Sequence, residues 1–148
     1  RREGENMRIY FERVNDPESA ACNSNCALWH LKHGWYYNVW DCSDDGKSGR
    51  IIGVFYVTQL AGLGGILHFE TVVRDIPAAH FFAAFRKAIR IVKPHLDGIF
   101  ATIPVHKKKL IRVMERIGFT KISLAAPLRS GGMEFALLQY FPRPETIV

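Results

Sequence analysis

The chain has 148 residues, enough for one domain with a sizeable core, and its hydrophobic content of 48% with a mean hydropathy of -0.03 is typical of a globular protein. The formal net charge of +6 favours anionic partners: a phosphorylated cofactor, nucleic acid or an acidic protein face. No apolar stretch reaches the length of a membrane span, and three cysteines, an odd number, argue against a disulfide framework. We therefore expect no membrane partner and a cytoplasmic location.

Composition divides the chain into three parts. Residues 1–6 are expected to be an N-terminal extension or a cloning remnant, and no apolar run follows them, so we expect no signal peptide. Residues 7–141 are expected to form the single domain, and residues 142–148, which contain Pro142 and Pro144, an extended C-terminal tail.

Apolar periodicity predicts the elements of this domain. Alternating or β-branched apolar residues predict strands at residues 7–14, 35–42, 50–58, 65–74, 98–103, 121–127 and 133–141. A turn is expected at residues 128–132, which include Gly131 and Gly132. Helical spacing predicts three helices, one from Pro17 to about Gly34, one at residues 78–92 and one at residues 106–117.

The first predicted helix carries the residue types of a zinc site, namely Cys22, Cys26, His30 and His33. A continuous helix rises ~1.5 Å per residue and strings these four side chains over roughly 16 Å. The four ligands of one zinc ion must all lie within about 2.0–2.3 Å of it. We therefore expect no metal site, and we expect Cys22, Cys26 and Trp29 to pack into the core.

The other two helices have an apolar face and a basic face. The apolar faces are expected to comprise Phe82, Phe85, Ile89 and Val92 in one helix and Leu110, Val113, Met114 and Ile117 in the other. The basic residues expected to lie away from them are Arg86, Lys87, Arg90 and Lys93, then Lys107, Lys108, Lys109, Arg112 and Arg116. Gly118 is the expected C-cap of the last helix.

The predicted order βαβββαβαββ resembles the GNAT fold of N-acetyltransferases over nearly the whole length from Met7 to Phe141. The most specific match is the run that ends in Ile117-Gly118-Phe119, where GNAT proteins often have a helix that ends in Tyr-Glu-Lys-hydrophobic-Gly-Phe. The resemblance implies one α/β (α+β) domain with a mixed, mostly antiparallel sheet that is splayed at its middle strand. It also implies helices on both faces of that sheet.

In the family, acetyl-coenzyme A lies beside the central strand and its pyrophosphate sits on a loop of pattern Gln/Arg-x-x-Gly-x-Gly/Ala. Carried over by this resemblance, the cofactor-binding residues are Val72, Val73, Arg74, Asp75, Ile76, Ala78, Ala79 and His106. Val72 and Val73 would face the pantetheine with their backbone, Arg74 to Ala79 would form the phosphate cradle, and His106 takes the position of a helix asparagine.

Two departures from the family pattern point to an eroded site. Pro77 replaces a loop glycine and removes one N–H, and the loss of a charge-assisted hydrogen bond costs ~1.5–3 kcal/mol. Met114 replaces a tyrosine that protonates the leaving thiolate in many members, and positioned acid catalysis is worth roughly 10²–10⁴-fold.

Glu70 and His68 are the catalytic candidates. They lie two residues apart in the central predicted strand and therefore share one of its faces. Glu70 could accept a proton from an amine directly or through water, with His68 as the alternative base. The competing interpretation is that both belong to a polar sheet position or to an interface, and the missing acid favours it.

A narrower resemblance connects the chain with small GNAT-like proteins of tailed phages that act in head assembly or inside the virion. They share a Met-Arg-Ile-Tyr-Phe-Glu-Arg-Val-style opening, a Phe-Glu-Thr central strand and a degenerate phosphate loop. This resemblance implies a protein partner in an assembly, and a location in the host cytoplasm or the virion.

Three functions follow from the sequence. The favoured one is an assembly or binding protein on a GNAT scaffold with a degenerate cofactor site. The alternative is an acetyl-CoA-dependent N-acetyltransferase of an unidentified amine. The third is a nucleic-acid-binding protein that uses the basic helices, although no reader motif is present.

Overall fold

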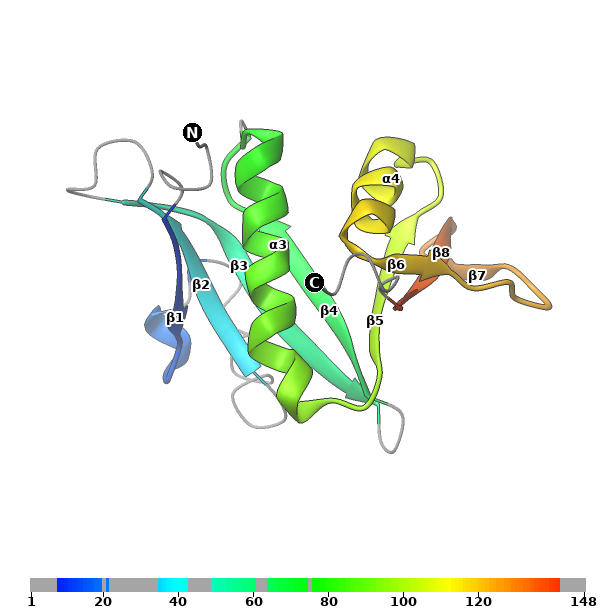
Figure 1. Cartoon of the computed structure of the whole chain (residues 1–148), viewed down its shortest axis with the longest axis horizontal. Helices are drawn as coiled ribbons and strands as arrows, with labels where there is room; N and C mark the ends of the chain where they lie inside the picture. The colour runs from blue at the N-terminus through cyan, green and yellow to red at the C-terminus, as the bar shows by residue number, and fades with distance from the viewer. Residues whose placement is uncertain are drawn as a thin grey trace. The chain divides into compact units, whose positions relative to one another are not determined.

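The computed structural model of the chain describes residues 8–19, 21, 35–42, 49–60, 64–74 and 76–141. The strands are β1 (Ile9–Arg13), β2 (Trp35–Asp41), β3 (Arg50–Leu60), β4 (Gly64–Thr71), β5 (Ile99–Pro104), β6 (Phe119–Lys121), β7 (Leu128–Ser130) and β8 (Met133–Tyr140) (Figure 1). The helices within these ranges are α3 (Ala78–Val92), α4 (Lys108–Ile117) and two short 3-10 helices, η1 (Pro17–Ser19) and η2 (Lys93–His95). No helix in the described ranges is both long and apolar enough to cross a membrane.

The strands form one mixed sheet in the order β1-β2-β3-β4-β5-β8-β6, with β7 also paired to β8. The ladders of β1 with β2, β2 with β3, and β8 with β5, β6 and β7 are antiparallel. The ladder of β4 with β5 is parallel and joins Gly65 to Ile99 and Ile66 to Phe100, at the beginning of both strands. The predicted α+β class with a mixed, mostly antiparallel sheet is confirmed.

The contacts of the chain define two compact units, and β4 contributes to both. Unit 1 comprises Arg1–Gln59 and His68–His95, and unit 2 comprises Leu60–Leu67 and Leu96–Val148. Among the described residues, helix α3 belongs to unit 1 and helix α4 to unit 2, each together with part of the sheet.

In unit 1, α3 packs on one face of the strands through aromatic side chains. Phe69 of β4 makes ring contacts with Phe81 and Phe85 of α3, with centroids 5.4 and 6.4 Å apart. Phe11 of β1 meets Phe55 of β3 at 5.6 Å. The bounds of α3 match the prediction. The side chains that it buries are Ala84, Phe85, Ala88, Ile89 and Val92.

Two side chains of α3 depart from the predicted pattern. Phe82 is only half-buried, and the guanidinium of Arg86 lies over its ring at 5.8 Å. Lys87 does not point away from the fold, because its Nζ donates a hydrogen bond of 2.6 Å to the carbonyl oxygen of Ile9. The long apolar stem of lysine lets its charged end reach the edge of β1 while the stem covers apolar surface.

The start of the chain can be followed only in part. Pro17 is the first residue of η1, and the backbone N–H of Ser19 donates to Asp16 Oδ1 at 3.1 Å, which is an N-cap arrangement. The region of the predicted helix that carries Cys22, Cys26, Trp29, His30 and His33 lies outside the described residues.

Three boundaries predicted for the elements of unit 2 differ from those in the structure. Helix α4 begins at Lys108 rather than His106, because the N–H of Lys107 closes a turn on the carbonyl of Pro104 at 3.0 Å. Strand β6 begins at Phe119, directly after the C-cap Gly118, and its pairing with β8 ends at Lys121. The predicted strand 121–127 is therefore wrong.

The segment 122–127 instead forms an arch between β6 and β7, both of which pair with β8. The N–H of Ile122 still donates to the carbonyl of Leu137 at 2.9 Å, but Pro127 has no N–H to give to a ladder. Pairing resumes at Leu128, and the turn is only Gly131-Gly132, with φ of 59° and 77°. Positive φ at both positions is the signature of a two-residue hairpin turn.

Candidate active site

The two catalytic candidates lie on the second half of β4, in unit 1. Phe69 between them faces α3, so the alternation of the strand places His68 and Glu70 on the opposite face. His68 is half-buried and Glu70 is exposed at the end of the strand. The predicted sharing of one face is consistent with the contacts that both residues make.

The structure adds two residues of β3 that the sequence prediction did not include. The hydroxyl of Tyr56 donates a hydrogen bond to Oε2 of Glu70. The ring of Tyr56 stacks on the imidazole of His68, with centroids 4.7 Å apart and an interplanar angle of 13°. The hydroxyl of Thr58 lies 3.0 Å from His68 Nε2. Both His68 and Glu70 are therefore in contact with side chains of the neighbouring strand.

A third aromatic ring supports this cluster from β2. Tyr36 is the register partner of Tyr56 and stacks on it at 5.6 Å with an interplanar angle of 7°. Tyr36 is 1% exposed and packs with Val14 and Val54. The exposed carboxylate of Glu70 is thus connected, through two stacked tyrosines, to the core of unit 1.

The predicted phosphate loop is also in unit 1, between β4 and α3. Val72 and Arg74 are exposed, Val73 and Ile76 are half-buried, and Asp75 lies outside the described residues. Pro77 is the N-cap of α3, with φ of −56° and ψ of 141°, and its carbonyl accepts hydrogen bonds from the N–H groups of His80 and Phe81 at 3.0 and 3.1 Å.

The first amides of α3 are suited to an anion. Ala78 and Ala79 follow Pro77, and N–H groups in the first turn of a helix have no acceptor within that helix. Both side chains are small, and Ala78 is exposed while Ala79 is half-buried. The loop therefore retains two backbone donors and the exposed guanidinium of Arg74, although Pro77 has lost its own N–H.

An unpredicted pair fixes the first turn of α3. His80 Nδ1 lies 2.6 Å from Asp41 Oδ2, at the end of β2. The side chain of Asp41 is 5% exposed and that of His80 is 18% exposed. A carboxylate accepts the Nδ1 proton and so fixes the orientation of the imidazole. The sequence signal was weak, because 39 residues separate the partners.

In unit 2, the two residues singled out by the family resemblance have different surroundings. His106 is exposed in the turn that precedes α4, and not within the helix as predicted. Met114 is 1% exposed and belongs to the core of the unit. A tyrosine in that place would have to bury its hydroxyl, so this position of α4 serves packing in this chain.

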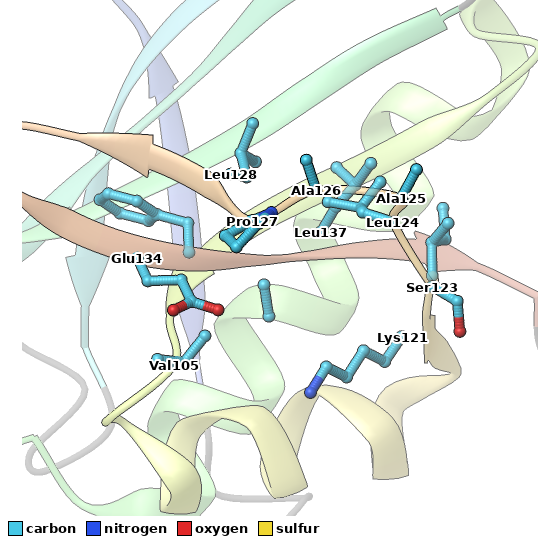
Figure 2. Close-up of a pocket in the computed structure, with 13 residues that line it drawn as sticks. Val105, Lys121, Ser123, Leu124, Ala125, Ala126, Pro127, Leu128, Glu134 and Leu137 are labelled. Atoms are coloured by element: carbon cyan, nitrogen blue, oxygen red, sulfur yellow. The ribbon is translucent and has the colours of Figure 1, made fainter.

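Unit 2 also contains a cavity of about 290 Å³ beneath the arch 122–127. Its apolar lining comes from the arch, β8, Val105 and Leu128, and Figure 2 shows the side chains of Lys121 and Glu134 on the side toward Val105. Glu134 lies 3.8 Å from the guanidinium of Arg129, in an exposed ion pair. Of the cofactor-binding and catalytic candidates that the structure describes, none lines this cavity.

Comparison with known proteins identifies the fold. No family model and no curated sequence matches the chain. The structure is similar to IAA acetyltransferase from Bacillus cereus ATCC 14579, with a TM-score of 0.65, 12% identity, and coverage of 90% of this chain and 99% of that one. The fold is that of the GNAT acetyltransferases.

Spermidine N-acetyltransferase from Vibrio cholerae, in a complex with CoA and spermine, is similar with a TM-score of 0.66 and 9% identity, covering 88% of this chain and 94% of that one. A chimera of the Vibrio cholerae enzyme with hSSAT gives 0.66 at 11% identity, covering 94% and 98%. These neighbours are N-acetyltransferases. None of them is described as a head-assembly protein, so the head-assembly interpretation receives no support from them.

Proposed function

We propose that this protein is an N-acetyltransferase that transfers the acetyl group of acetyl-CoA to an amine. The observation that carries the proposal is the Glu70 cluster: an exposed carboxylate at the end of β4, held by the hydroxyl of Tyr56 beside a histidine. A general base must reach the proton that it removes, and an exposed carboxylate on a rigid strand can do so.

The cofactor-binding candidates fit acetyl-CoA in their chemistry. The amides of Ala78 and Ala79 and the guanidinium of Arg74 are donors for the pyrophosphate, and the pantetheine would lie against the chain just after β4, at the exposed Val72 and the half-buried Val73. Pro77 reduces the number of donors by one, and Arg74 and the two amides remain as candidates. Asp75, Ile76 and His106 remain candidates by resemblance.

The proposed reaction uses the residues as follows. Glu70 takes a proton from the amine nitrogen, which forms a bond to the acetyl carbonyl carbon while the carbon–sulfur bond breaks. Coenzyme A leaves as the thiolate and takes its proton from solvent, because Met114 has no proton to give. The absence of that positioned acid predicts a slow enzyme, by roughly 10²–10⁴-fold relative to one that has it.

Calorimetric titration with acetyl-CoA and with CoA tests the proposal. We expect micromolar binding, and acetyl transfer to at least one member of a panel of primary amines that includes spermidine and spermine. Glu70→Gln serves as the matched variant, because it should bind acetyl-CoA as the wild type does and lose turnover. An absence of binding up to about 1 mM, where a dissociation constant corresponds to a binding free energy of only ~4 kcal/mol, would contradict the proposal. It would favour the interpretation as an assembly or binding protein on a GNAT scaffold.

A further inference from the structure

The Glu70 cluster contains more side chains than a general base requires. We infer that Tyr56 is a positioning residue that holds Glu70 for proton transfer, and that His68 belongs to the supporting stack and is not the base. This inference rests on the proposed function and decides between the two catalytic candidates within it.

The direction of the Tyr56 hydroxyl is fixed by its two neighbours. The rings of Tyr36, Tyr56 and His68 come from adjacent strands β2, β3 and β4 and are nearly parallel, with interplanar angles of 7° and 13°. Tyr36 is buried with Val14 and Val54, so the Tyr36 end of the stack cannot move without disturbing the core. The ring of Tyr56 is held between these two rings, so its hydroxyl points in one direction.

That direction is toward Glu70. The Tyr56 hydroxyl donates to Oε2, which orients the carboxylate and leaves Oε1 to accept the proton of an amine. Glu70 is otherwise exposed at the end of a strand, where a glutamate side chain with three rotatable bonds would sample many orientations. Holding a catalytic group in its productive geometry is worth a large factor in rate, and a displacement of 1 Å can cost about 10²-fold.

His68 is less suited to be the base. Its Nε2 is in hydrogen-bond contact with the hydroxyl of Thr58, and one face of its ring is covered by Tyr56. These contacts fix the imidazole in the sheet. They give it a role in the stack, as the side chain against which the ring of Tyr56 rests.

The test compares four purified variants in steady-state acetyl transfer with the best amine of the panel. Tyr56→Phe keeps the stacked ring and removes only the hydroxyl, so it should fold, bind acetyl-CoA normally, and lose about 10- to 100-fold in kcat with little change in KM. His68→Phe keeps an aromatic ring and should lose less than about tenfold. Glu70→Gln should lose about 10²–10⁴-fold. Tyr10→Phe, which removes a hydroxyl from a side chain that is 58% exposed on β1, is the matched control and should behave as the wild type.

The outcomes separate this inference from the proposed function. If the wild type neither binds nor turns over acetyl-CoA, the proposed function fails and the inference fails with it. If the wild type is active and Tyr56→Phe retains its full kcat, or if His68→Phe loses as much as Glu70→Gln, only the inference is overturned. A loss in Tyr56→Phe that appears as a raised KM at constant kcat would also overturn it, because that pattern indicates substrate binding and not positioning of the base.

Discussion

Pro77 is the residue that weakens the candidate phosphate site most directly. Its ring removes one N–H at the N-cap of α3, where the chain should approach a pyrophosphate. Its dihedral angles, φ of −56° and ψ of 141°, lie in a region that any L-residue adopts, so the backbone geometry does not depend on proline. The donor can therefore be restored without changing the shape of the loop.

We expect Pro77→Ala to bind CoA more tightly than the wild type, by roughly 10- to 150-fold if the restored amide makes one charge-assisted hydrogen bond of ~1.5–3 kcal/mol. The variant should lose about 0.4–1 kcal/mol of unfolding free energy, because the unfolded chain gains freedom. Calorimetric titration measures the first quantity and denaturant unfolding the second.

Pro94→Ala, at the exposed proline of η2, is the control for that experiment, since it alters the unfolded chain in the same way but lies at the other end of α3. Unchanged CoA affinity in Pro77→Ala would show that the loop does not face the pyrophosphate.

At the scale of elements, the beginning of β4 depends on a very close backbone approach. Gly64 has φ of +124°, and a Cβ at this position would lie 1.9 Å from the carbonyl oxygen of Gly98. The adjacent N–H of Gly65 donates to the same oxygen at 2.9 Å, where the parallel ladder with β5 begins. Both the conformation and the space at this point therefore require glycine.

Gly64→Ala is expected to destabilise the protein by more than about 3 kcal/mol, because backbone must move on both sides of the ladder. Gly131→Ala is the matched control: its φ is +59° and a Cβ there would meet nothing within 4 Å, so the cost should be only about 1 kcal/mol of backbone strain. Chemical denaturation of the two variants measures the difference. Equal losses would contradict the steric explanation.

The site cluster depends on another close approach between elements. A Cβ on Gly53 of β3 would lie 2.5 Å from the carbonyl oxygen of Glu70. The N–H of Val72 donates to the carbonyl of Ile52 at 2.9 Å, which holds the end of β4 near the same part of β3. The backbone of Glu70 can therefore lie this close to β3 only because Gly53 has no side chain.

At the scale of the whole molecule, the main feature is an excess of exposed basic side chains. The net charge is +6, and α4 exposes Lys108, Lys109, Arg112 and Arg116 against the single acidic residue Glu115. A nucleic-acid role would also draw on α3, but Lys87 is bound to the Ile9 carbonyl and is removed from that set. Charge of this kind produces binding that depends on salt and not on sequence.

We expect the protein to bind duplex DNA weakly at 50 mM salt and to lose roughly 40-fold in affinity at 200 mM, as about three neutralised phosphates predict. Fluorescence anisotropy measures this slope. The triple variant Lys108→Gln, Lys109→Gln, Arg112→Gln should flatten it. Its control is Arg86→Gln, because that guanidinium lies over the ring of Phe82. A flat response in the wild type would remove the nucleic-acid hypothesis.

The sequence predicted the elements well where the determining signal is local. The bounds of α3, the sharing of one face of β4 by His68 and Glu70, and the C-cap Gly118 all follow from periodicity or from a single residue type. The arch 122–127 was missed because its apolar residues resemble those of a strand. Where the pairing with β8 stops and resumes depends on the backbone groups of β8, which are distant in sequence.

Residues that act across strands could not be found in the same way. The alternation of the third strand places Tyr56 and Thr58 on one face, but their contacts with Glu70 and His68 require the register between β3 and β4. Asp41 and His80 are 39 residues apart in the sequence, and no local pattern connects them. The resemblance to a family supplied the candidate phosphate loop but not these partners.

The Gly131-Gly132 turn offers a practical point of access to the molecule. Both glycines are surrounded by open space, and the flanking pair Ser130–Met133 closes the hairpin behind them. Exposed turns of this kind are the sites where proteins accept inserted residues most readily. A short tag or a dye-bearing cysteine placed between the two glycines would immobilise or report on the protein from unit 2. The stacked rings and the candidate phosphate loop of unit 1 would keep their native side chains during every binding measurement.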